Sequence, residues 1–270
     1  MRQQSSVARL LASAAVAAIL AVGLGGCQTM SDITGSLSPK AETSAGPDPD
    51  PRRSVEVYGE RYRANPKDAD AALLYGQALR ATAQRSQAVA VLEQATIAHP
   101  GNKALLAGYG RALADNGNFQ QGFDVLTRAH SPDNPDWRIL SVQGTVLDQL
   151  GRHDEARRYY ESALKVVPEE PSVLSNLGLS YVLSRDLPKA EEALRRAYSS
   201  TRADARVRQN LGLVVGLQGR FAEAESIVKA DLPAEEAAAN VAYLKQMLSR
   251  KDSPRDGAGT VPVASLSRPN

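Results

Sequence analysis

Five glycines at one spacing constrain the fold more than any other feature of the chain. They recur every 34 residues, at Gly76, Gly110, Gly144, Gly178 and Gly212. Glycine makes up 20 of 270 residues, so chance would produce such a row with a probability of only about 10⁻³, all frames and periods considered. Inside a helix glycine costs up to about 1 kcal/mol relative to alanine. Its recurrence therefore predicts a repeated helical unit in which two elements pack closely at this position.

Other columns of the sequence follow the same period. Counted from Ala69, positions 4, 7, 8 and 11 form one face of a helix, and they are mostly apolar, with the repeated glycine at position 8. Small or apolar residues at positions 20, 24 and 27 indicate a second helix. Position 15 is suited to the left-handed residue that ends the first helix, because three repeats carry glycine there. Ala83 and Arg185 replace that glycine in the first and fourth repeats.

These columns resemble the tetratricopeptide-repeat consensus across residues 69–232. The resemblance implies an all-α fold, a right-handed superhelical solenoid of five 34-residue helix-turn-helix repeats. A solenoid needs polar-faced ends. We therefore expect an N-terminal capping helix, or half repeat, at residues 53–68 and a C-terminal capping helix at residues 233–250. The apolar side of the second cap would comprise Ala238, Val241, Ala242, Leu244 and Leu248.

The N-terminus has the layout of a bacterial export signal. Arg2 and Arg9 precede an uncharged stretch rich in alanine and leucine that ends in the letters LGGC. This ending resembles the lipobox of bacterial lipoproteins. The resemblance implies a signal peptide at residues 1–26, cleavage between Gly26 and Cys27, and acylation of Cys27. A retained transmembrane helix or plain secretion is the alternative.

The segments that flank the repeats have the composition of disordered chain. Residues 27–52 are rich in Ser, Thr, Gly, Pro and Asp and include PDPDPRR, which cannot form a helix. We expect them to tether the repeats to the lipidated cysteine, and we expect residues 251–270 to form a disordered tail. Gln28 follows the cysteine, where aspartate would resemble an inner-membrane retention signal. The expected location is the periplasmic face of a membrane in the bacterial envelope, with the outer membrane favoured.

Charge and residue types argue against several classes of function. The net charge of +2 is accounted for by Arg2 and Arg9, so the remainder is neutral and offers no basis for nucleic-acid binding. Of the three histidines, His153 occupies a position that is normally aromatic and is predicted to pack, and none has a partner at metal-ligand spacing. We therefore expect no enzymatic activity, no cofactor, no metal and no small-molecule substrate.

The inner face of a solenoid of this type is lined mainly by positions 2, 5, 6, 9, 12 and 13 of the first helix. One subclass grips chaperone tails with lysine and asparagine at positions 5 and 9, and most of that clamp is absent. The fourth and fifth repeats instead place apolar residues there, which would form a groove for a partner helix or extended segment. The expected groove comprises Asn176, Leu179, Val182, Leu183, Arg206, Gln209, Asn210, Leu213 and Leu217. Alternatively, the capping helix or a tightened superhelix covers these side chains.

Three C-terminal segments carry a more particular resemblance. LSNLGLSYVLSRDLPKAEEALRRA, ADARVRQNLGLVVGLQGRFAEAE and DLPAEEAAANVAYLKQML resemble the TadD lipoproteins of tight-adherence (Flp/Tad) pilus assembly. The resemblance implies a membrane-tethered scaffold for the pilus export machine, with its secretin as a candidate protein partner. Two other roles stay open. One is a general or pilotin-like envelope lipoprotein that serves another complex, and the other is an accessory subunit of a cell-wall enzyme.

Overall fold

The computed structural model describes residues 50–252, so the expected signal peptide, Cys27 and the segment after residue 252 lie outside the described residues. The described part forms twelve α-helices without a β-strand. No helix in this part is both long and apolar enough to span a membrane. The helices are α2 (Pro51–Ala64), α3 (Ala69–Ala81), α4 (Arg85–Ala98), α5 (Lys103–Asp115), α6 (Phe119–Ala129), α7 (Trp137–Gln149), α8 (His153–Val166), α9 (Pro171–Leu183), α10 (Leu187–Tyr198), α11 (Ala205–Leu217), α12 (Phe221–Val228) and α13 (Ala234–Asp252).

The helices from α3 to α12 alternate as an A helix and a B helix with a fixed period. Each A helix has 13 residues, and each A and B helix begins 34 residues after the previous one of its kind. Four A helices begin at a side chain that accepts a backbone hydrogen bond in the first turn: Asp68, Asn102, Asp136 and Asp204. The remaining A helix, α9, has no such cap and begins at Pro171, whose fixed φ suits the first helical position. The predicted all-helical solenoid is confirmed.

Every A helix ends in the same tight turn, whatever residue occupies position 15. The three glycines at this position have φ between 74° and 85°. Ala83 and Arg185 adopt the same left-handed conformation, with φ of 58° and 63°, although a β-carbon is unfavourable there. In all five turns the N–H of position 16 donates to the carbonyl of position 11, as from Asp186 to Tyr181 at 2.9 Å. This closure is the Schellman arrangement, which the backbone keeps even without glycine.

The repeated glycines mark the contact between the two helices of each pair. A β-carbon on Gly144 would lie 2.6 Å from the ring of Tyr160, and one on Gly178 would lie 2.6 Å from Leu194 Cγ. In the other three pairs the glycine faces the same position of the B helix, at 2.5–2.6 Å, namely Leu92, Leu126 and Val228. Such distances lie inside van der Waals contact. A larger residue at position 8 would therefore push the paired helices apart.

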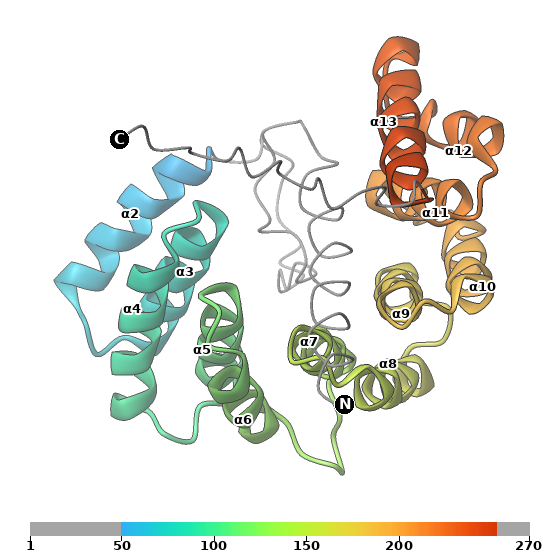
Figure 1. The fold of residues 1–270 in the computed structure, drawn as a ribbon. Helices are drawn as coiled ribbons and strands as arrows, with labels where there is room; N and C mark the ends of the chain where they lie inside the picture. Colours follow the sequence, from blue (N-terminus) through green and yellow to red (C-terminus); the bar gives the residue numbers. More distant parts are fainter. Residues whose placement is uncertain (1–49, 253–270) are drawn as a thin grey trace, which may run out of the picture.

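The helix pairs stack into an arch (Figure 1). The A helices α3, α5, α7, α9 and α11 follow its inner side, and the B helices α4, α6, α8 and α10 lie on its outer side. Buried apolar residues form clusters that follow one another along the stack and share neighbours such as Phe123 and Tyr181. The core is therefore extended rather than central, and the inner side is built from segments that are far apart in sequence.

Helices α2 and α13 pack at the two ends of the arch (Figure 1). The expectation that PDPDPRR is not helical is wrong for its last three residues, because α2 begins at Pro51, where proline suits the first helical position. On α13, Leu244 lies so close to α11 that a β-carbon on Gly216 would be 2.5 Å from its Cδ2 atom. Ala237 lies seven residues before Leu244 on the same face of α13, and it is fully buried. Ala238 and Ala242 are exposed. The prediction that these two alanines belong to the apolar side is wrong, because the contact with Gly216 sets the rotation of the helix.

The connection between α6 and α7 differs from the others. Helix α6 has 11 residues, whereas α4 and α8 have 14, and the proline-containing segment after Ala129 predicts this early end. Gln143 of α7 is buried at a position where the other repeats have tyrosine or leucine. Its Oε1 atom lies 3.0 Å from His130 Nε2, and its Nε2 atom donates to Thr127 Oγ1 at 3.1 Å. A polar contact therefore joins the second and third helix pairs.

Candidate partner-binding surface

The leucines predicted to line a groove lie on two adjacent A helices, α9 and α11 (Figure 1). Leu179 and Leu183 on α9, and Leu213 and Leu217 on α11, are all half-buried. Leu217 packs against the core cluster of the last two pairs. Leu179, Leu183 and Leu213 belong to none of the core clusters of the described residues. The structure therefore leaves three leucines with partly accessible side chains on neighbouring helices.

Val182 does not belong to this surface. Its side chain is only 3% exposed and packs in one cluster with Leu211 and Val214 of α11. Its prediction as a groove residue is wrong, because position 12 of α9 turns toward the next A helix instead of the open inner side. Arg206 and Gln209, the other predicted residues of α11, remain half-buried.

The two predicted asparagines make contacts within the solenoid. Asn176 Nδ2 donates to Ser141 Oγ at 3.1 Å, and Asn210 Nδ2 donates to Ser175 Oγ at 2.9 Å. Both serines are buried, so the amides satisfy hydroxyl groups that water does not reach. Each asparagine therefore ties its A helix to the preceding one, a role that its prediction as a groove residue does not include.

A third tie has the same spacing near the other end of the arch. Arg80 Nε lies 2.6 Å from Asp115 Oδ2, and these residues are 35 positions apart, as are the two Ser–Asn pairs. A separation of 35 residues leads to the next A helix, one position further along it. This signal is present in the sequence. A search for complementary polar residues at i and i+35 would have found all three ties.

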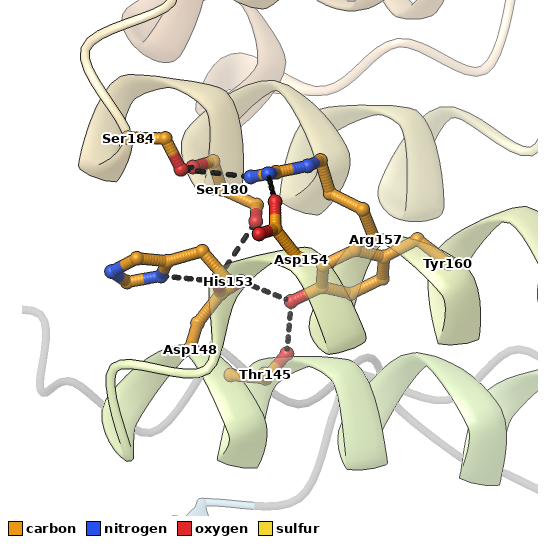
Figure 2. A network of polar contacts seen from close by, with 8 residues as sticks. All are labelled: Thr145, Asp148, His153, Asp154, Arg157, Tyr160, Ser180 and Ser184. Carbon is orange, nitrogen blue, oxygen red and sulfur yellow. Dashed lines mark hydrogen bonds and ion pairs between the residues drawn. The ribbon is translucent and has the colours of Figure 1, made fainter.

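A buried carboxylate joins helices α7, α8 and α9 (Figure 2). Asp148 is 8% exposed and accepts hydrogen bonds from Tyr160 Oη at 2.9 Å and Ser180 Oγ at 2.8 Å. Its Oδ1 atom also lies 2.8 Å from His153 Nδ1. Burial raises the pKa of Asp148, and the three hydrogen bonds oppose that shift. Burial and the nearby carboxylate raise the pKa of Tyr160 well above its ordinary value. The network fixes the third helix pair against the fourth.

This network does not have the geometry of a catalytic triad. In a triad the histidine lies between the carboxylate and the nucleophilic hydroxyl, whereas His153 and Ser180 both contact Asp148 Oδ1. Ser180 is also fully buried. Across residues 50–252, no three His, Cys, Asp or Glu side chains are grouped to hold a metal ion. His153, predicted as a packing residue, thus also makes a polar contact that joins α7 to α8.

Sequence comparison finds the repeat in two segments. Residues 79–135 and 142–206 match the family model of the tetratricopeptide repeat. Among curated proteins, the chain is similar to the cytochrome c-type biogenesis protein CycH of Bradyrhizobium diazoefficiens. The two are 30% identical over 145 residues, which cover 52% of this chain and 38% of CycH. The chain spans between 27% and 45% of the length of the curated relatives it matches. The similarity therefore concerns a part of each relative.

Structure comparison finds the same architecture in solved proteins. The crystal structure of PilW, a widely conserved type IV pilus biogenesis factor, has a TM-score of 0.63 at 18% identity, and the match covers 72% of this chain and 91% of PilW. PilF of Pseudomonas aeruginosa has a TM-score of 0.53 at 17% identity, with 68% and 91% covered. Likeness at these identities is a likeness of fold. The described part of the chain therefore has the fold of a tetratricopeptide-repeat solenoid, and two of its segments match the repeat itself.

Proposed function

We propose that this chain is a non-catalytic, membrane-tethered scaffold for assembly of a Flp/Tad-type pilus secretion machine. It binds segments of partner proteins on the inner side of its arch, and the secretin of the machine is the candidate partner. Acylated Cys27 anchors it at the periplasmic face of the outer membrane. The resemblance of the last repeats to TadD supports this role, and so does the shared fold of PilW, a pilus biogenesis factor.

The observation that carries the binding role is the set of leucines outside the core. Leu179, Leu183 and Leu213 lie on neighbouring A helices and keep part of their apolar surface accessible. Covering apolar surface contributes roughly 25 cal/mol per Å². An amphipathic helix or an extended apolar segment that lies across α9 and α11 would gain this energy.

Crosslinking in intact cells tests the binding surface. We expect Leu179→Asp to lower partner capture at least about tenfold, since a buried carboxylate without a partner disfavours the complex. The matched control is Ile97→Asp, because Ile97 is 68% exposed on the outer helix α4. Circular dichroism and thermal melting of Leu179→Asp should stay near wild type. Unchanged capture, or a loss of helix content, would show that this leucine is not a contact residue.

The anchor is tested in the same cells with Cys27→Ser, which removes the acylated thiol. We expect this form to leave the membrane fraction and to support less pilus assembly than the lipidated protein. Recovery of a cell-wall enzyme without pilus proteins would assign the scaffold to another envelope complex. Equal pilus assembly by the soluble form would contradict the role of the anchor.

A further inference from the structure

A guanidinium without a partner is buried in the N-terminal part of the arch. Arg111 on α5 is 5% exposed, and its Nε and Nη2 atoms are buried and make no hydrogen bond within residues 50–252. In the same residues, His130 is the one other side chain with a buried nitrogen or oxygen in this condition. Burial of an unpaired charge is costly, and such groups are rare in folded proteins. The retention of Arg111 therefore needs a reason beyond folding.

The acidic groups near Arg111 are already engaged elsewhere. Asp115 contacts Arg80 Nε at 2.6 Å, and Asp136 accepts a hydrogen bond from the backbone N–H of Arg138 at 2.8 Å, where it caps α7. Burial, followed by the positive charge of Arg80, lowers the pKa of Arg111 to about 10. Arg111 stays protonated at neutral pH. Three guanidinium groups and two carboxylates leave this cluster with one positive charge in excess.

The edge of the cluster is accessible, because Arg80 and Arg138 are half-buried, while Arg111 lies deeper on the helix between theirs. Arg80, Arg111 and Arg138 belong to α3, α5 and α7, the successive A helices on the inner side of the arch (Figure 1). The guanidinium of Arg138 is held over the ring of Trp137, 4.6 Å from its centroid. Arg80 is held by Asp115, so both neighbours of Arg111 are fixed by contacts of their own.

We propose that Arg111, with Arg80 and Arg138 beside it, binds one carboxylate from an acidic segment of a partner protein. The carboxylate belongs to an aspartate or glutamate side chain of that segment. A guanidinium presents parallel N–H donors that match the two oxygens of a carboxylate. One excess positive charge is balanced by one negative charge, whereas Asp115 and Asp136 would repel the second charge of a phosphate. Arg111 thus retains donors that the fold leaves unused.

This site deepens the proposed scaffold role and is independent of its leucine surface. The cluster belongs to the first three A helices, whereas the leucines belong to the last two. A failure of Leu179→Asp to affect capture would therefore leave the carboxylate site standing. Loss of the carboxylate site would leave the leucine surface standing.

The binding test uses the mature full-length chain with Cys27→Ser, which keeps it in solution. The probe is the peptide Gly-Ser-Glu-Ser-Gly, blocked at both ends, with Gly-Ser-Gln-Ser-Gly as its neutral counterpart. In chemical-shift titrations we expect the acidic peptide to bind at least about tenfold more tightly. Arg111→Gln should remove this difference, while Arg128→Gln, exposed on the outer helix α6, should keep it. Equal affinities in wild type, or binding only of Gly-Ser-Gly-Ser-Gly with a free C-terminal carboxylate, would overturn the proposal.

Thermal melting separates a binding role from a structural one. Without peptide, Arg111→Met should raise the melting temperature by about 2–4 °C, because it replaces an unpaired buried charge with an apolar side chain. The same variant should bind the acidic peptide no better than the neutral one. A lower melting temperature, or full retention of peptide selectivity, would show that Arg111 serves the fold and not a ligand.

Discussion

The inner side of the arch carries two kinds of surface on one frame. Helices α3, α5 and α7 bring together the charged cluster around Arg111, whereas α9 and α11 present half-buried leucines such as Leu179 and Leu213. Both parts have A helices of the same length, the same turn at position 15 and the same glycine contact at position 8. The comparison shows that the frame constrains a few positions in each repeat. The remaining inner positions differ between the two parts.

The largest effect is expected at the glycine contact of position 8, which both parts of the arch share. Gly110→Val and Gly178→Val should each lower the free energy of unfolding by about 3 kcal/mol, because the new side chain overlaps Leu126 or Leu194. Urea denaturation followed by circular dichroism measures the loss. Gly101→Val is the control, since a β-carbon at Gly101 would meet nothing within 4 Å. A much smaller loss in one part would mean that the two parts do not share this contact.

A smaller loss of stability is expected when the hydrogen bonds between successive A helices are removed, and it should differ between the two parts. Asp115→Asn should cost about 2 kcal/mol, because it removes the negative charge of the ion pair that Asp115 forms with Arg80, whose side chain is 13% exposed. Asn210→Ala should cost about 1 kcal/mol, the value of a neutral hydrogen bond to buried Ser175. Thermal and urea unfolding measure both, with Asp133→Asn in an exposed turn as the control. Equal losses would show that the charged tie is no stronger than the neutral one.

The smallest effect concerns the turns at position 15. In each part of the arch, one of these turns has another residue in place of glycine. Ala83→Gly and Arg185→Gly should each stabilise the protein by about 0.5 kcal/mol, since relief of a left-handed conformation exceeds the added freedom of the unfolded chain. Gly151→Ala is the reverse control and should destabilise the third repeat. Precise differences in denaturation midpoint measure these changes. If both glycine variants were less stable, the side chains themselves would stabilise their turns.

The repeated features could be predicted because each depends on a short stretch of sequence. Helix spacing, the glycine contact and the turns are set within one period, and five copies confirm one another. The outcome for Val182 depends instead on how α9 meets α11, which no pattern within a repeat describes. The Asp148 network joins three helices, and the isolation of Arg111 is known only when every neighbour has been placed. Interactions between repeats, rather than within them, were therefore the ones missed.

The ties at a separation of 35 residues have a consequence for how such a chain can diverge. Ser141 and Asn176, or Ser175 and Asn210, are two halves of one interaction carried by different repeats. A repeat that is duplicated or exchanged as a unit brings only one side chain of each pair, so its neighbour need not carry the matching hydrogen-bonding group. The fourth repeat carries one half of both ties, so the third, fourth and fifth repeats depend on one another. A graft that redesigns the inner side should therefore carry α7, α9 and α11 together.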